Sequence, residues 1–383
     1  MICVFDKFTP QNRFNTCGER ILQPLSCEST QVLNGDWSLT MEYLISDKDD
    51  AWRYLVPHNI VRLHNGQLFP IYWMQRKVNS SGLPVVSVRA RHIFYYLNDK
   101  ITRNVEYYGN CYAHINDIFN QADFGRGSGF TDYDFTYGSN IGSLKTIKFD
   151  GCSIAYALMG AAESVLNLHN GELYRDNFYF SINDRMEGCR DNAFNLIHGF
   201  NLTEVSETLD YSEMVTDLIT EDNLGHWLRT SLEPGAGIPH QVLRYQKLSY
   251  SDNDENQFLS DTDELYLKNF EPIRTYDVNF VDLRKTNKAR DWQDIERLKI
   301  GDTGHIYSSM LGNISAQKII QIKTDEISQR VKSMKLGDFK HNSMHQNKYD
   351  LILQNDGSDS RRINVLEAKT AIIEMITAPE GGE

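Results

Sequence analysis

The residues best suited to chemistry, namely histidine, cysteine and the acidic side chains, are dispersed along this chain rather than gathered in motifs. None of the eleven histidines belongs to a His-Glu-x-x-His pair, and no cluster of cysteine and histidine has the spacing of a zinc site. His58 and His64 lie six residues apart around an expected turn, which is ordinary for surface or strand histidines. We therefore predict no metal site.

Two segments bear a faint likeness to ligand-binding loops. Gly125-Arg-Gly-Ser-Gly129 lacks the Gly-Lys-Ser/Thr ending of a phosphate-binding loop and the Gly-x-Ser-x-Gly pattern of a hydrolase nucleophile. Asp252-Asn-Asp-Glu-Asn256 lacks the glycine and the final glutamate that a calcium-binding EF-hand requires. We interpret the first as a mobile loop and the second as a solvated one. No cofactor is expected.

Acidic and aromatic residues leave two alternatives open. The 52 acidic residues permit paired carboxylates for glycoside cleavage, because the fold and not sequence spacing brings such pairs together. The run Phe94-Tyr-Tyr96 is interpreted as core, with a sugar-binding platform as the alternative. No segment matches a peptidase motif. The sequence nominates no catalytic residue, and we expect a protein that is not an enzyme.

Composition restricts the function classes further. A chain of 383 residues predicts two to four domains, and its net charge of −13 disfavours nucleic-acid binding, which depends on Lys and Arg contacts to phosphates. Six cysteines without a C-x-x-C pair indicate reduced thiols and assembly in a cytoplasm. The start has no basic region followed by an apolar run, and the most apolar stretch, Ile154–Leu168, carries Glu163. Neither a signal peptide nor a membrane span is expected.

The elements at the start of the chain are strands. Residues 37–45 alternate almost strictly between apolar and polar side chains, which predicts a strand with one buried face. Asn65-Gly66 and the turn Asn79–Gly82 then separate further strands, as in hairpins. Residues 1–100 are therefore expected to form a small antiparallel β-barrel.

Composition changes near residue 100, and residues 101–195 are expected to form an α/β insertion. Asn110–Ala122 has helical spacing, and Ser153 is placed to cap a second helix over Ile154–Leu168, with Gly171 past its end. A hairpin over residues 172–182 should turn at Asp176-Asn177.

Strands resume after residue 196. We expect a second β-barrel over residues 196–340, interrupted by an exposed acidic insertion near 225–270, and a C-terminal segment over 341–383. The expected elements of this part are strands at Thr216–Ile219, Tyr276–Leu283, Ile300–Thr303, Lys318–Ile322 and Lys332–Phe339 and a short helix at Asp291–Leu298. The predicted fold class is mainly β with an α/β insertion, an α+β protein with two small antiparallel β-barrel domains per subunit.

Three blocks in order resemble one family. The blocks are residues 36–43 with 66–72 and 88–97; Asn170-Gly-Glu-Leu-Tyr-Arg-Asp-Asn-Phe178; and residues 277–283 with Leu298-Lys-Ile-Gly-Asp-Thr303 and 335–339. Their order and spacing over residues 30–340 resemble the N-terminal module of phage tail-tip proteins, the tail-associated or prophage endopeptidase tail family, similar in fold to baseplate hubs of contractile-tailed phages.

That resemblance implies a structural role in a virion. It implies a homotrimeric ring that closes the tail tube, with two barrels per subunit alternating around the ring so that three molecules dock on a sixfold distal tail ring. Further implied partners are the tape-measure protein and tail fibre or receptor-binding proteins, with DNA as transient cargo and no stable membrane association. Assembly would take place in the bacterial host cytoplasm. The alternatives are a tail-associated peptidoglycan-degrading enzyme and a cell-wall-binding adhesin.

Overall fold

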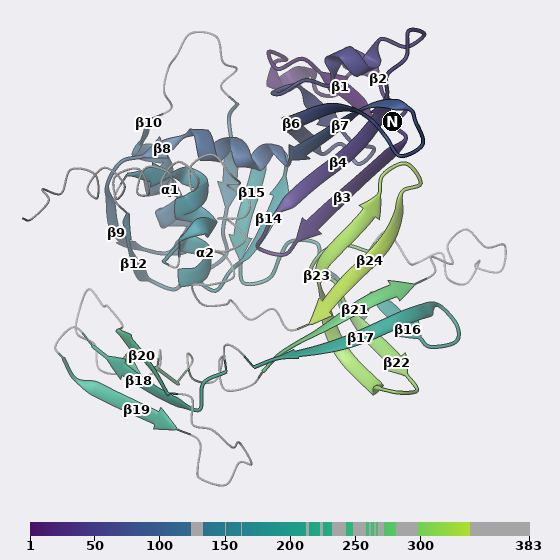
Figure 1. Cartoon of the computed structure of the whole chain (residues 1–383). Coiled ribbons are helices and arrows are strands. Elements are labelled where there is room, and N and C mark those ends of the chain that lie inside the picture. Colours follow the sequence, from purple (N-terminus) through teal and green to yellow (C-terminus); the bar gives the residue numbers. More distant parts are fainter. Residues whose placement is uncertain are drawn as a thin grey trace, which may run out of the picture.

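The structure is a computed structural model that describes residues 1–123, 133–149, 151–161, 163–211, 214–222, 225–231, 243–247, 258–259, 262–263, 266, 272–280 and 298–337. Strands dominate these residues, as the sequence predicts (Figure 1). No helix in the described ranges combines the length and the apolar content needed to cross a membrane. Gly125–Gly129, Asp252–Asn256 and the tail 341–383 lie outside these ranges, as does nearly all of the expected helix Asp291–Leu298.

The N-terminal half of the fold is built from hairpins. Apolar residues of β4 are buried in alternation with more exposed polar ones, which confirms the period of two. The turns after β5 and β6 use Gly66 and Gly82 at φ of 86° and 78°, where a side chain would be strained. Its elements are β1 (Cys3–Phe5), η1 (Gln11–Arg13), β2 (Arg20–Ile21), β3 (Ser26–Val32), β4 (Trp37–Leu44), η2 (Ala51–Tyr54), β5 (Ile60–Arg62), β6 (Leu68–Val78), β7 (Pro84–Arg91) and η3 (Ile93–Asp99).

The C-terminal half has its own apolar core, centred on residues such as Tyr276, Ile319 and Leu336. The strands expected at 276–283, 318–322 and 332–339 are present with shifted ends, whereas Ile300–Asp302 precede a strand instead of forming one. The strands are β16 (Phe194–Ile197), β17 (Leu202–Asp210), β21 (Ile273–Phe280), β22 (Thr303–Ser308), β23 (Gly312–Asp325) and β24 (Arg330–Gly337).

One long strand joins the two halves. The first part of β23 pairs with β22, from Gly312 opposite Ser308 to Lys318 opposite Thr303. Its second part pairs antiparallel with β3, while β24 pairs with the other edge. Thirteen of the described strands therefore form one continuous sheet that runs through both halves. Their pairing closes neither half into a ring of strands, so the two-barrel description goes beyond the observed pairing.

The insertion packs beside this sheet around a separate core (Figure 1). Asn110 caps α1 through Ala113 N–H, and the turn at Asn177 has φ of 51°, which confirms the predicted helix and hairpin. The elements are β8 (Ile101–Thr102), β9 (Val105–Gly109), α1 (Cys111–Asn120), β10 (Ala122–Asp123), β11 (Thr136–Gly138), β12 (Lys145–Phe149), β13 (Cys152–Ser153), η4 (Tyr156–Gly160), α2 (Val165–Leu168), β14 (Glu172–Asp176) and β15 (Tyr179–Asn183).

The single helix predicted over Ile154–Leu168 is wrong. The chain forms a π-helical turn, η4, and a separate short helix, α2, with Ser164 capping α2 through Asn167 N–H. Ser153 does accept a hydrogen bond from Tyr156 N–H, at 3.2 Å. The apolar stripe misled because most of this segment is buried, so burial stabilises two short turns as well as one helix would.

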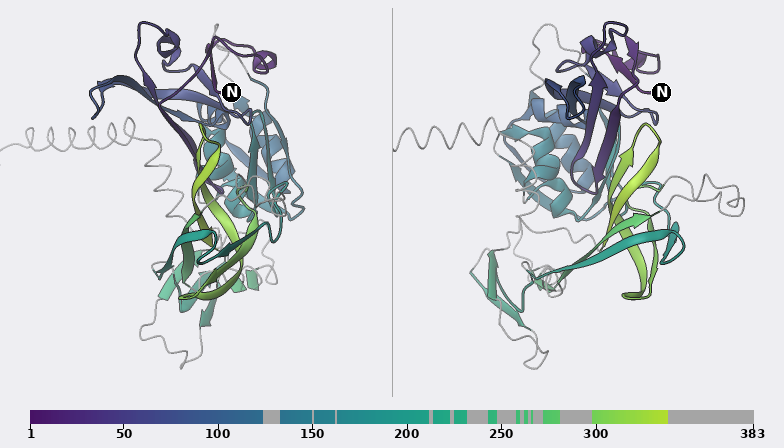
Figure 2. Two further views of the ribbon diagram at one scale, coloured as in Figure 1. Left: turned by 90° about the vertical axis from the view of Figure 1, so that its right-hand side faces the viewer. Right: turned by 45° about the vertical axis from the view of Figure 1, so that its right-hand side comes forward.

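A small three-stranded sheet lies at the end of the arm formed by β17 and β21 (Figure 2). It contains β18 (Asp217–Glu221), β19 (Trp227–Ser231) and β20 (Leu243–Lys247), with β18 in the centre. The acidic insertion expected near 225–270 therefore includes two strands, β19 and β20. Its acidic residues 251–255 lie outside the described ranges.

Gly304→Ala should destabilise the C-terminal half. A Cβ at Gly304 would stand 2.4 Å from the backbone oxygen of Phe194, and a backbone atom cannot move aside cheaply. We expect the free energy of unfolding to fall by about 1–3 kcal/mol in urea titrations. Gly142→Ala is the matched control, because nothing lies within 4 Å of that Cβ. Equal stability of the two variants would contradict the close strand contact.

Candidate functional site

The described residues bring together no metal site. They hold no group of three or more histidine, cysteine or acidic side chains placed to share an ion. His58 and His64 are both exposed, as expected of surface histidines. Phe94 and Tyr95 are buried in the insertion core, which favours the core interpretation of that aromatic run over a sugar platform.

All six cysteines are free. Burial raises the pKa of Cys111 and of Cys189 to about 11. A thiol with such a pKa is protonated near neutral pH and is a poor nucleophile. Cys189 instead donates weakly to the carbonyl oxygen of Ile300, at 3.5 Å.

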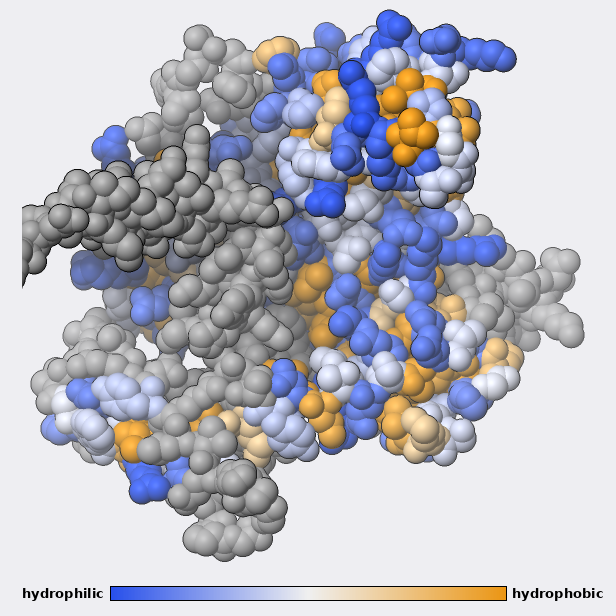
Figure 3. All heavy atoms as spheres, viewed as in Figure 1, coloured by the Kyte–Doolittle hydropathy of each residue, from blue (hydrophilic) through white to orange (hydrophobic). Residues whose placement is uncertain are grey.

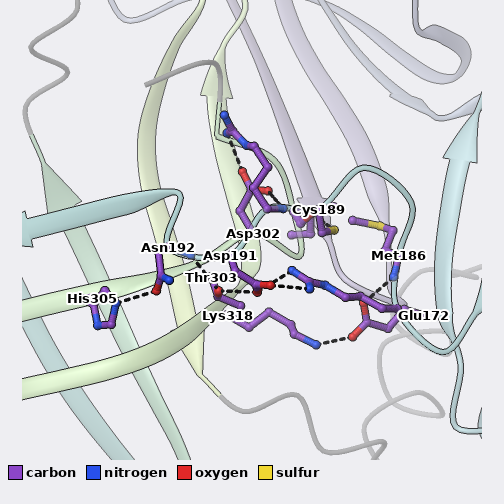
Figure 4. A network of polar contacts seen from close by, with 12 residues as sticks. Glu172, Met186, Cys189, Asp191, Asn192, Asp302, Thr303, His305 and Lys318 are labelled. Carbon is purple, nitrogen blue, oxygen red and sulfur yellow. Dashed lines mark hydrogen bonds and ion pairs between the residues drawn. The ribbon is translucent and has the colours of Figure 1, made fainter. Parts of the chain in front are cut away.

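A network of charged and polar contacts joins the insertion to the C-terminal half (Figure 4). Glu172 on β14 is buried, and one of its carboxylate oxygens pairs with the ammonium of Lys318 on β23. Its other oxygen accepts a hydrogen bond from Met186 N–H, at 2.9 Å. Figure 4 shows the Lys318 side chain reaching across to Glu172. The contact therefore ties β14 to the strand that joins the two halves.

Asp302 forms the second buried contact. Its Oδ1 accepts from Arg190 N–H at 2.8 Å, and its Oδ2 accepts from the guanidinium of Arg190 at 2.9 Å and from Lys299 N–H at 3.0 Å. The Asp302 side chain is 0% exposed. A buried carboxylate with this many donors holds the loop before β22 against the end of the insertion.

Exposed polar contacts surround the two buried ones. Arg185 forms a two-point ion pair with Asp191, and Asp191 also accepts from the hydroxyl of Thr303 at 3.1 Å. His305 and Asn192 share a hydrogen bond of 2.7 Å. Such exposed pairs contribute little to stability compared with buried ones.

This network is suited to holding parts together rather than to catalysis. Both oxygens of Glu172 and both of Asp302 are engaged by donors, so neither carboxylate is free to exchange a proton with a substrate. Sequence reasoning nominated neither residue. Glu172 and Asp302 do lie in two of the blocks that carry the family resemblance, but nothing in those blocks indicated that the two segments meet.

A buried histidine pair lies in the insertion core. His169 and His114 share a hydrogen bond of 2.9 Å, and His114 Nε2 donates to the carbonyl oxygen of Lys145. A carbonyl only accepts, so His114 carries its proton on Nε2, and its Nδ1 accepts from His169 Nε2–H. Ser143 Oγ is 3.2 Å from the remaining nitrogen, His169 Nδ1, which completes a directed chain of neutral groups. Burial lowers the pKa of both histidines to about 4.

Asp302→Asn should destabilise the protein far more than Asp191→Asn. The amide removes a buried charge and cannot accept all three hydrogen bonds, so we expect a loss of about 2–4 kcal/mol in denaturant titrations. Asp191 belongs to an ion pair whose partners are 43% and 64% exposed, for which a loss within about 1 kcal/mol is expected. Equal losses would mean that the Asp302 contact is not buried.

Acid should destabilise the insertion through His114 and His169. The unfolded imidazoles have ordinary pKa values near 6.5, so between about pH 6.5 and 4 the unfolded state binds more protons. This contribution is intact above pH 6.5 and is lost as the pH falls towards 4. When the free energy of unfolding is measured from pH 7 to pH 5, its slope against pH should be smaller in His169→Gln. The decrease should correspond to about one proton less taken up on unfolding. An unchanged slope in His169→Gln would contradict the assignment.

Comparison with known proteins identifies sequences and structures that resemble this chain. Residues 9–92 match the sequence profile of the prophage endopeptidase tail N-terminal domain. A search of curated proteins found no relative of the chain.

Solved structures of phage tail proteins share the fold over most of the chain. Prophage tail protein gp18 from Listeria monocytogenes EGD-e is 15% identical with a TM-score of 0.58, covering 91% of this chain and 98% of that one. A tail protein from Neisseria meningitidis MC58 is 11% identical with a TM-score of 0.59, covering 88% and 96%. The 43 kDa tail protein of prophage MuSo2 from Shewanella oneidensis is 12% identical with a TM-score of 0.55, covering 88% and 97%.

These findings confirm the family resemblance seen in the sequence: residues 9–92 match the N-terminal domain of the prophage endopeptidase tail family, within a fold that the chain shares with prophage tail proteins.

Proposed function

We propose that this protein is a structural hub at the distal tip of a phage tail, where three copies form a ring that closes the tail tube and opens for DNA passage during infection. The observation that carries the proposal is the fold itself. The chain shares its fold with tail proteins over 88–91% of its length. The match of residues 9–92 supports the same role.

The two β halves supply the basis for the ring geometry. Each has its own apolar core, one containing Met41 and the other Tyr276, and the pairing of β3 with β23 holds the two at a set distance. In the proposal, each half acts as one barrel-like lobe. Three subunits then present six lobes to a sixfold distal tail ring. The division at residues 1–100, 101–195, 196–340 and 341–383 belongs to this proposal.

Charge supports a channel that lets DNA pass without binding it. Each chain carries a formal charge of −13, so a ring of three chains carries three times that charge. An acidic lumen repels phosphates, so DNA would be transient cargo and not a stable partner. The tape-measure protein and the tail fibre or receptor-binding proteins are further proposed partners. The location would be the virion tail tip, after assembly in the bacterial host cytoplasm.

The second candidate is a cell-wall-binding adhesin. Trp227 and Tyr245 lie on β19 and β20 with ring centroids 5.7 Å apart, and both side chains are exposed. Exposed aromatic rings can stack on the apolar faces of sugars, and Glu221 on β18 accepts a hydrogen bond from Tyr245. A peptidoglycan-degrading enzyme has no comparable observation in its favour among the described residues.

Light scattering of the purified full chain should give three times the 44.2 kDa mass of one chain. Averaged images of intact tails should show the same threefold ring at the tip, next to a sixfold ring. A stable single copy inside assembled tails would overturn the hub proposal.

Assays on host cell walls separate the alternatives. The hub proposal expects no clear zone in a peptidoglycan zymogram, whereas a clear zone would favour the enzyme. Binding of the isolated chain to wall polysaccharide, lost in Trp227→Ala and retained in Tyr211→Ala, would favour the adhesin. Tyr211 serves as the control because it is similarly exposed but precedes the three-stranded sheet.

A further inference from the structure

Two strands of the continuous sheet have a backbone edge that no described strand covers. β17 pairs with β21 on one side, and no strand of the described ranges pairs with its other side. β5 covers only Leu68–Pro70 of β6, so residues 73–78 of β6 pair with β7 alone. Within the described part of the chain, residues 203–209 and residues 73–78 therefore each present an open edge. Edges of this length readily accept another strand.

Both edges carry the pattern apolar, charged, apolar. The residues are Met74, Arg76 and Val78 on β6 and Val205, Glu207 and Leu209 on β17. The strand registers place Met74 and Val205 on the same face of the sheet, where each packs against the apolar core of its own half. Val78 is 68% exposed and Leu209 is 40% exposed. A strand laid along either edge would remove this apolar surface from water.

The two central charges are opposite and are weakly engaged within the chain. Arg76 is exposed and makes no ion pair among the described residues; its guanidinium carbon lies 5.4 Å from the ring centroid of Trp52. Glu207 accepts from the hydroxyl of Tyr276 at 3.1 Å and lies 3.6 Å from Arg274. An exposed pair at that distance contributes little to stability, so Glu207 can pair with a further cation.

Strand direction suits a contact between copies of the chain. Eight strands lie along the sheet from β17 to β6, and each neighbouring pair among them is antiparallel. β17 and β6 therefore run in opposite directions. Rotation about an axis along the strands keeps their direction, so β6 of one copy meets β17 of the next as an antiparallel neighbour.

We propose that the open edge of β6 in one copy pairs with the open edge of β17 in the next copy, with Arg76 opposite Glu207. This interface rests on the ring of the proposed function and assigns its subunit contact. In this antiparallel register the flanking apolar pairs are Met74 with Leu209 and Val78 with Val205. The contact is head-to-tail and uses both edges of every copy, which is the arrangement that a closed ring requires.

Charge reversal tests the pair between Arg76 and Glu207. Arg76→Glu and Glu207→Arg each place like charges opposite one another at every contact. Each should therefore weaken association at least about tenfold in light scattering over a concentration series. The double variant restores an opposite pair and should recover most of the association. Circular dichroism establishes that each variant is folded, and Arg76→Glu alone decides the outcome if Glu207→Arg does not fold.

Arg53→Glu is the matched control for Arg76→Glu. Arg53 is also exposed, and its guanidinium carbon lies 5.5 Å from the centroid of the same Trp52 ring. It belongs to η2 and not to the β6 edge. The Arg53→Glu variant should therefore associate as the parent does.

Amide hydrogen exchange tests the strand pairing itself. Alternate amides of residues 73–78 and 203–209 should exchange at least about tenfold more slowly in the assembled parent than in Arg76→Glu, because pairing protects the outward-facing amides. A trimer that persists in Arg76→Glu, or that leaves both segments unprotected, overturns this interface and leaves the hub proposal intact. A parent that keeps the mass of one copy at every concentration overturns both the interface and the ring.

Discussion

The pairing of β23 with β3 is the constraint on which the rest of the structure depends. A strand of fourteen residues exposes two rows of backbone donors and acceptors, and each buried row needs partners. β24 satisfies one edge, and β22 followed by β3 satisfies the other. Beyond the ladder, Leu33 N–H donates to the Ile320 carbonyl, and Ser29 donates to the buried carboxylate of Glu326. Without β3, half of one edge would lose its partners, and the two halves would no longer share one sheet.

The insertion is held to this sheet by a different kind of contact. Buried Asn34 donates to the carbonyl of Gly171 and accepts from Leu173 N–H. Its amide side chain therefore makes the two hydrogen bonds to the insertion backbone that a neighbouring strand would otherwise make. Asn177 contacts Leu68 N–H and the Gly66 carbonyl in the same manner. The buried carboxylates of Glu172 and Asp302 secure the opposite side. On the face shown in Figure 3, hydrophilic and hydrophobic residues are interspersed over both halves.

Local features of the fold could be predicted from the sequence, and long-range ones could not. Alternation in β4, the hairpin at Asn65-Gly66 and the helical spacing that forms α1 depend on neighbouring residues, so a short stretch of sequence is enough to predict them. The break between η4 and α2 depends on how their buried residues pack in the insertion core, which an apolar stripe does not reveal. Likewise, the sequence around Asp302 does not indicate that this residue will be buried against Arg190, because the two residues lie 112 positions apart.

The junction strand also has a consequence for how the protein is made. Ser29 and Glu326, which meet beside the β3–β23 ladder, are separated by 297 positions. On a translating ribosome, β3 therefore emerges long before its partner and must wait with one backbone edge open. Contacts of such high sequence separation slow folding and leave intermediates prone to aggregate. Glu28 and Thr30 give the unpaired edge of β3 a charged and a polar side chain, which discourages pairing with strands of other proteins. Once β23 has been synthesised, Lys323 forms an ion pair with Glu28.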